Sequence, residues 1–128
     1  MHAFKWSFAF GLLTALTSAP AMADGASETV TAQMHADLAA HAADLSGVQT
    51  HLHHVLNCLV GPGGAGFDAK QMNPCANAGN GAIPDTSATA KKQILNEAAD
   101  KARTGIAATD LATAQKTAVQ IATMLKGK

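Results

Sequence analysis

The chain has 128 residues, with nine Lys or Arg, nine Asp or Glu and a formal net charge of +0 at pH 7. This balance gives no electrostatic basis for nucleic-acid binding, which needs a basic surface. The length suits one small domain and leaves little room for a second hydrophobic core.

Residues 1–23 have the pattern of a secretory signal peptide. Lys5 provides a positive start, WSFAFGLLTAL a short apolar run, and Ala21, Met22 and Ala23 an A-x-A cleavage site. The apolar run is shorter than the roughly 20 residues that span a bilayer. We therefore expect cleavage before Asp24 and a periplasmic or secreted mature protein that no membrane segment anchors.

Cleavage changes the composition of the mature chain, residues 24–128, which we expect to form a single domain. Every Phe and Trp except Phe67 lies in the signal peptide. The mature core must therefore be aliphatic. Loss of Lys5 also leaves one more acidic than basic residue, which again argues against nucleic acid as a partner.

Residues 27–60 predict a long helical segment, because they lack proline and their apolar residues recur at helical spacing. Ser27 is a candidate N-cap, and Glu28 behind it suits the helix dipole. We expect a break or kink at Ser46 and Gly47, since glycine weakens a helix interior. The predicted buried stripe consists of Val30, Met34, Leu38, Leu45, Val48, Leu52, Val55 and Leu59.

Residues 61–84 predict a long loop, because they are rich in glycine and proline and show neither helical nor strand periodicity. Cys75 lies in this loop and Cys58 near the end of the first helical segment. In an exported protein the pair is expected to form one disulfide, which tethers the loop.

Two further helices are predicted after the loop. The first is capped by Asp85, Thr86 or Ser87 and ends near Gly105, and the second starts at Thr109 or Asp110. Their short connection favours antiparallel packing. The predicted fold is thus all-α, a small three- or four-helix bundle with a long, disulfide-tethered Gly/Pro-rich loop.

A histidine pair is the main candidate for chemistry. His51 and His54 are three residues apart on the first helical segment, on the flank that also carries Cys58. Neutral imidazoles at this spacing can reach one ion, and imidazole suits copper and zinc. His53 points elsewhere on the helical wheel.

Two ligands do not complete a metal site, and the sequence leaves the others open. With a disulfide, Asp68 or Met72 of the loop could contribute, the soft Met72 favouring Cu(I) and Asp68 favouring Zn(II) or Cu(II). With reduced thiols, Cys58 and Cys75 could join His51 and His54 in a tetrahedral zinc site, although export argues against free thiols.

The competing interpretation makes the histidines structural. His51, His53 and His54 could be solvated surface residues, and His35 is expected at the surface. His41 falls inside the predicted apolar stripe, which favours a core histidine with a polar partner. It is also a possible further metal ligand, or an axial haem ligand, but a single Phe without Trp or Tyr cannot readily line a haem pocket.

We predict no enzymatic activity. Ser27, Ser46 and Ser87 fit caps or a helix break, and none lies in a nucleophile elbow. The glycines of residues 61–66 lack the Gly-Lys-Ser/Thr ending of a phosphate-binding loop.

The favoured function is therefore an exported small protein that binds copper or zinc for storage, buffering or sensing. The alternative is a non-enzymatic interaction or structural module, in which the loop presents Phe67 to an unidentified protein.

Overall fold

The computed structural model describes residues 25–128, which form five helices and no strand. They are α1 (Ala26–Ala40), α2 (Leu45–Val60), α3 (Ala82–Asp85), α4 (Thr89–Ile106) and α5 (Leu111–Leu125). The predicted all-α class is confirmed. The predicted signal peptide and its cleavage site lie outside the described residues.

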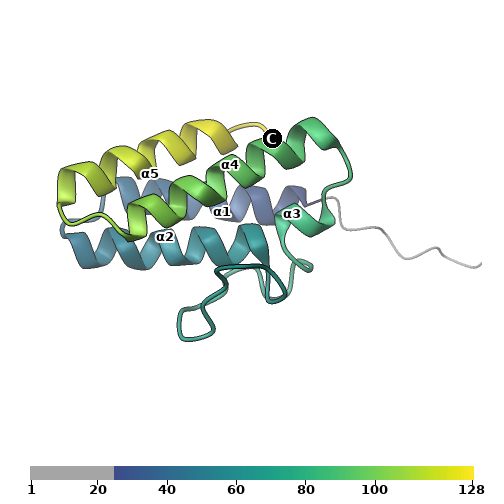
Figure 1. Cartoon of the computed structure of the whole chain (residues 1–128), viewed down its shortest axis with the longest axis horizontal. Coiled ribbons are helices and arrows are strands. Elements are labelled where there is room, and N and C mark those ends of the chain that lie inside the picture. Colours follow the sequence, from purple (N-terminus) through teal and green to yellow (C-terminus); the bar gives the residue numbers. More distant parts are fainter. Residues whose placement is uncertain (1–24) are drawn as a thin grey trace, which may run out of the picture.

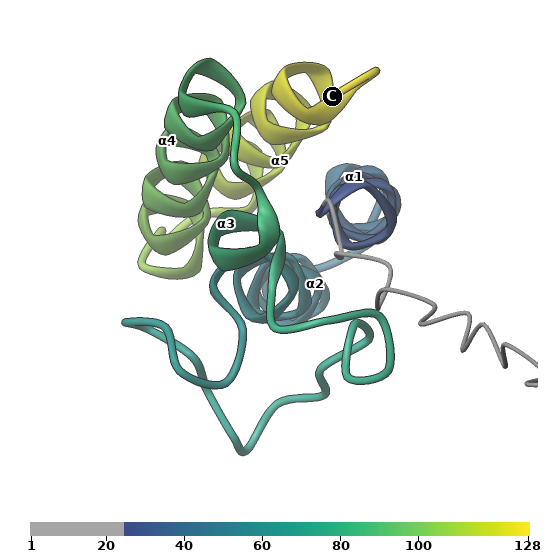
Figure 2. The same cartoon turned by 90° about the vertical axis from the view of Figure 1, so that its right-hand side faces the viewer.

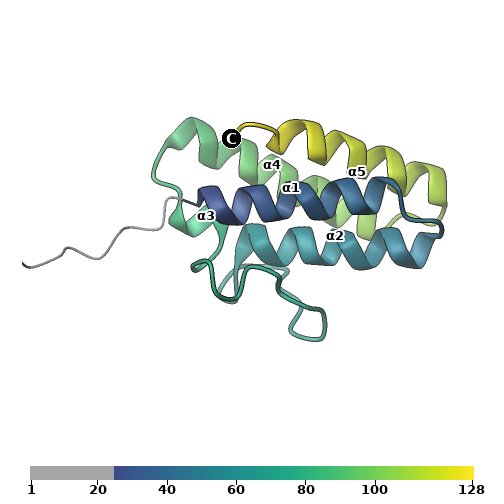
Figure 3. The same cartoon turned by 180° about the vertical axis from the view of Figure 1, so that it is seen from behind.

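Four long helices lie side by side and successive ones run in opposite directions (Figure 1). Seen end on, α1 lies between α2 and α5, and α4 completes the ring by packing on both α2 and α5 (Figure 2). The short links after α1 and α4 impose this antiparallel order. From behind, α1 lies directly against α2, with the loop below (Figure 3).

The core is aliphatic, as predicted, but the side chains that α2 contributes are larger than those of the helices that face it. Helix α2 contributes large side chains, since Val48, Leu52, Val55 and Leu59 are all fully buried. The other long helices face them mainly with alanines. Small facing residues let helix axes approach closely: a Cβ added at Gly105 of α4 would lie only 2.5 Å from Leu52 Cδ1.

The predicted buried stripe is wrong for α1. Val30, Met34 and Leu38 are 63%, 53% and 46% exposed, whereas the alanines Ala32, Ala36 and Ala39 are fully buried. The helical segment breaks between α1 and α2, so a wheel drawn through both assigns the wrong face to α1. Alanine also permits the closer contact with α2 and α5.

The break lies before Ser46 and Gly47, not at them. Asp44 has extended backbone angles and caps α2, its side chain accepting a hydrogen bond of 2.7 Å from Gly47 N. Asp110, one of the two predicted starts, caps α5 in the same way by accepting from Thr113 N at 2.8 Å. The other predicted caps are wrong: Gly25 precedes α1 and Ala88 precedes α4, neither with a side-chain cap bond.

The predicted disulfide between Cys58 and Cys75 is confirmed, and it encloses the first part of the loop. The predicted loop of residues 61–84 is shorter by the turn of α3, which begins at Ala82. The loop crosses itself where Gly61 meets Asn80 and Gly81. A side chain at Gly61 would collide with Asn80 O, so only glycine fits this crossing.

Asn57, next to the disulfide, organises the loop. Its side chain is fully buried; Nδ2 donates to the carbonyls of Asp68 at 3.0 Å and Met72 at 3.2 Å, and Oδ1 accepts from Asp68 N at 2.9 Å. One amide therefore ties the loop to α2, in addition to the backbone hydrogen bonds of the turns within the loop.

Two carboxyl groups meet at the start of α1. Glu28 is 1% exposed, and both its Oε1 and Oδ2 of Asp85 lie beside Gly79, where a Cβ would collide with either oxygen. Burial raises the pKa of Glu28, with a further contribution from Asp85, whereas hydrogen bonds from Asn80 lower the pKa of Asp85. Burial therefore favours the protonated form of Glu28 and the hydrogen bonds from Asn80 the ionised form of Asp85, so Glu28 does not serve as an exposed charge near the helix dipole.

We expect replacement of Asn57 by Ala to lower the free energy of unfolding by about 2–3 kcal/mol, because it removes several buried hydrogen bonds at once. Urea denaturation of the oxidised protein measures the loss. Asn77→Ala, the same change at an exposed loop position, is the control and should cost less than about 0.5 kcal/mol. Equal effects of the two changes would contradict the organising role of Asn57.

Glu28→Gln should leave the protein at least as stable as the natural chain at pH 7. Because the pKa of folded Glu28 is raised, its stabilising contribution is present below its ordinary pKa and is lost as pH rises through the raised value. Glutamine keeps a hydrogen-bond donor and does not ionise. Glu28→Ala removes the donor and should cost about 1–3 kcal/mol. Urea denaturation between pH 4 and 8 tests both, with the exposed Glu97→Gln as the control; equal losses from Gln and Ala would refute this assignment.

Candidate metal centre

His51 and His54 lie close together on one flank of α2, as their spacing predicts. Their ring centroids are 5.6 Å apart and their planes nearly perpendicular. His54 is buried, with 7% exposure, whereas His51 is half-buried. The pair therefore occupies the edge of the core rather than the solvent.

The third histidine comes from α1 and was missed by the sequence interpretation, which placed His35 at the surface. His35 is 8% exposed, its Nδ1 lies 3.3 Å from His51 Nδ1, and its ring centroid is 5.0 Å from that of His54. One ligand nitrogen from each of the three lies within 4.8 Å of the others. We call His35, His51 and His54 the histidine triad.

The local packing explains how His35 reaches the pair. It precedes the fully buried Ala36 and lies one turn from Ala32 and Ala39, so it shares the alanine face that α1 turns toward its neighbours. The short link to α2 then places that face against the flank with His51 and His54. A sequence interpretation that chose the alanines as the contact face of α1 would have found His35.

Burial favours the neutral form of two members of the triad, His35 and His54. Loss of hydration lowers the pKa of His54 to about 4, with smaller contributions from His35, His51 and His53. Burial also lowers the pKa of His35, with His51 adding to the effect. Neutral imidazoles are the form that binds metal ions. Nδ1 of His54 is buried and has no hydrogen-bond partner in the described structure, so a ligand nitrogen is available.

The spacing fits a single ion. Two nitrogens bound at 2.0–2.1 Å to one tetrahedral zinc ion lie about 3.3 Å apart, and the Nδ1 atoms of His35 and His51 are 3.3 Å apart. The whole set spans up to 4.8 Å, so the triad needs a small ring rotation to close on the ion. Each imidazole also has a second nitrogen that rotation can present.

Of the further ligands proposed from sequence, Asp68 and His41 lie outside the triad, and a contribution from Met72 stays a prediction. Asp68 faces His53 instead, with Oδ2 3.7 Å from its Nδ1, and Met72 is 57% exposed. His41 was expected inside the apolar stripe, which is wrong: it is exposed at the end of α1, with Nδ1 2.8 Å from Asp37 O. Because α1 turns its alanine face inward, residues in line with Leu38 point outward.

The Cys2His2 zinc alternative is also wrong, since Cys58 and Cys75 are bonded to each other and neither offers a thiolate. Phe67 is half-buried and packs against the core. Its role as a contact for a partner protein stays a prediction.

None of the helices within residues 25–128 is long and apolar enough to cross a membrane. No family model, curated protein or solved structure matches the chain.

Metal-free protein should lose stability as pH falls from about 6.5 to about 4. The pKa of His54 is lowered to about 4 in the folded protein, so over this interval the unfolded chain binds a proton at His54 more readily than the folded protein does. His54→Leu removes this group. It should reduce the loss of unfolding free energy over that interval by up to about 3 kcal/mol. Denaturation in the presence of EDTA at each pH measures the difference. His41→Leu at an exposed position is the matched control, and identical profiles for the two variants would count against burial of a neutral His54.

Proposed function

We propose that this protein is exported and binds one transition-metal ion, copper or zinc, through His35, His51 and His54. The convergence of three imidazoles where α1 meets α2 carries the proposal. Storage, buffering or sensing of the metal is the function that such a binding site would serve. The proposal assigns no catalytic activity to the protein.

The chemistry of the ligand set supports copper or zinc. Imidazole nitrogen suits both metals, whereas magnesium and calcium need oxygen ligands. Within residues 25–128, the triad is the only group of three or more His, Cys, Asp or Glu side chains that could hold an ion. All its members are histidines, so this site offers no carboxylate or thiolate ligand.

The charge of the site favours copper(I) over the divalent ions. Imidazole binds a metal as a neutral ligand, and two of the three histidines are more than nine-tenths buried. The cost of burying an ion rises with the square of its charge. Copper(I) can also be bound by three ligands alone, whereas zinc requires a fourth ligand. Zinc would need water, entering beside the half-buried His51, to complete its coordination.

Two observations support export. The disulfide is characteristic of proteins in oxidising compartments. Residues 1–23 also carry the sequence pattern of a signal peptide.

Purified oxidised protein, residues 24–128, should bind one copper(I) ion per chain when titrated without oxygen against a chromophoric copper(I) chelator. Calorimetric titration with Cu(II) and Zn(II) provides the comparison. His35→Ala, His51→Ala and His54→Ala should each weaken binding by more than the about 10–100-fold that loss of an outer-shell partner costs.

His53→Ala is the control, because His53 lies on the same helix but outside the triad. It should retain the affinity of the natural chain. Binding of all three metals no tighter than millimolar would refute the proposed function, as would triad variants that bind like the control.

A further inference from the structure

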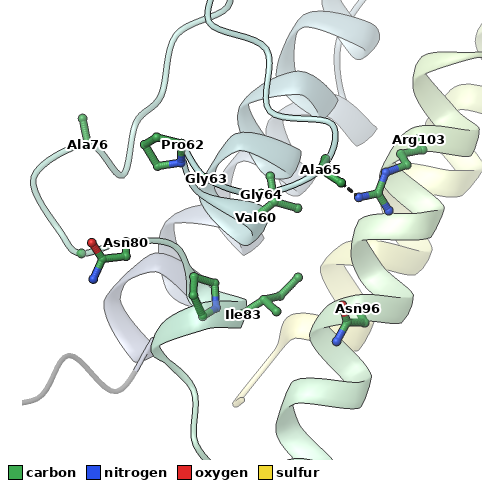
Figure 4. A pocket seen from close by; sticks show the side chains of 12 residues that line it. Val60, Pro62, Gly63, Gly64, Ala65, Ala76, Asn80, Ile83, Asn96 and Arg103 are labelled. Atoms are coloured by element: carbon green, nitrogen blue, oxygen red, sulfur yellow. Dashed lines mark hydrogen bonds between the residues drawn. The ribbon is translucent and has the colours of Figure 1, made fainter.

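A cleft of about 750 Å³ lies away from the triad. It is lined by the loop, the end of α2, α3 and one face of α4 (Figure 4). This volume is within the range of about 300–1,000 Å³ that is typical of small-molecule sites. None of the triad histidines lines the cleft.

The walls of the cleft combine an apolar floor with polar groups at its edges. Val60 and Ile83 lie near its centre (Figure 4), and Pro62 and Pro84 also line it. Asn96 and Arg103 project from α4 on one side, and Asn80 lies on the opposite side (Figure 4). A few polar groups around an apolar surface are the usual pattern of a site that binds and orients a small organic molecule.

The cleft is held in shape by contacts that do not depend on a ligand. The crossing of Gly61 with Asn80 and Gly81 fixes one wall, and Asn57 and the disulfide fix the loop behind it. Arg103 ties the loop to α4 through a bond of 2.8 Å from Nη2 to Ala65 O. A ligand would therefore meet a preformed surface and would not have to order the loop.

Arg103 gives the cleft its charge. It is the only charged residue among those that line the cleft, and no acidic residue lines it. Nη2 is bonded to Ala65 O, and Nη1 lies 2.6 Å from Asp100 Oδ1. Two of the five N–H groups are thus occupied, which leaves donors for a ligand.

The ion pair with Asp100 does not cancel this donor capacity. The side chain of Asp100 is 77% exposed, and exposed ion pairs are weak because water screens them. A ligand carboxylate in the cleft could therefore compete with Asp100 for the guanidinium, with Val60 and Ile83 available to the apolar part of the ligand.

We propose that this cleft binds a small organic acid with one carboxylate and a short apolar body. Arg103 holds the carboxylate, Val60 and Ile83 contact the apolar body, and Asn96 contributes hydrogen bonding at the rim. The inference is independent of the proposed metal binding, because the two sites share no residue.

The test uses 3-phenylpropionate as the probe and 3-phenylpropan-1-ol as its neutral counterpart, each titrated into oxidised protein and followed by two-dimensional ¹H–¹⁵N NMR. The ring of the probe is easily detected, since Phe67 is the only Phe, Tyr or Trp in residues 24–128. We expect shifts at Val60, Ile83 and Arg103, and an affinity for the carboxylate about threefold to tenfold above that for the alcohol.

Three variants separate the role of Arg103 from general effects. Arg103→Gln should abolish the preference for the carboxylate. Asp100→Asn should strengthen carboxylate binding by about twofold to fivefold, because it frees the guanidinium from its competitor. Lys101→Gln is the control: it removes one positive charge from the same helix at a residue that does not line the cleft, and should leave the preference unchanged.

Equal binding of the acid and the alcohol by the natural chain would overturn the proposal, as would the absence of shifts at the cleft with 20 mM probe. If Arg103→Gln disturbs the loop, Asp100→Asn still decides: unchanged or weaker carboxylate binding in that variant contradicts the assigned role of Arg103.

Discussion

The close contact between the alanine face of α1 and its neighbours is the constraint on which the candidate metal centre depends. Ala32, Ala36 and Ala39 are fully buried, so the backbone of α1 can lie near that of α2. His35 lies on this face and therefore contacts His51 and His54. The same choice of face leaves Val30, Met34 and Leu38 exposed. The histidine cluster and the exposed apolar residues of α1 are thus two consequences of one packing arrangement.

Helix α2 contributes to the core, to the candidate metal centre and to the cleft. One face supplies the largest side chains of the core, a flank carries two members of the triad, and its last turns hold Asn57 and Cys58, which shape the loop. The loop is ordered by a buried amide, a disulfide and a glycine crossing rather than by regular hydrogen bonding. This arrangement lets a segment without secondary structure form one wall of a cleft.

Burial controls the protonation of this sparsely charged protein in two opposite ways. It lowers the pKa of His54 and His35, which favours the neutral imidazole, the form that can bind a metal ion. It raises the pKa of Glu28, which favours the protonated carboxyl group beside Asp85. In each case the neutral form is favoured because the core hydrates charge poorly.

The sequence by itself determined the features that depend on local chemistry. Helical periodicity predicted an all-α chain, and Thr109 or Asp110 the start of its last helix. Glycine and proline predicted the loop, and two cysteines the disulfide. Spacing along one helix also identified His51 and His54. Only the tertiary structure decided which face of α1 is buried. The helix is interrupted before Asp44 caps α2, so the residues of α1 and α2 do not share one helical wheel. Alanines also pack more closely than the larger residues beside them. His35, sixteen residues from His51, joined the site through that contact between helices, which no pattern within a single helix contains.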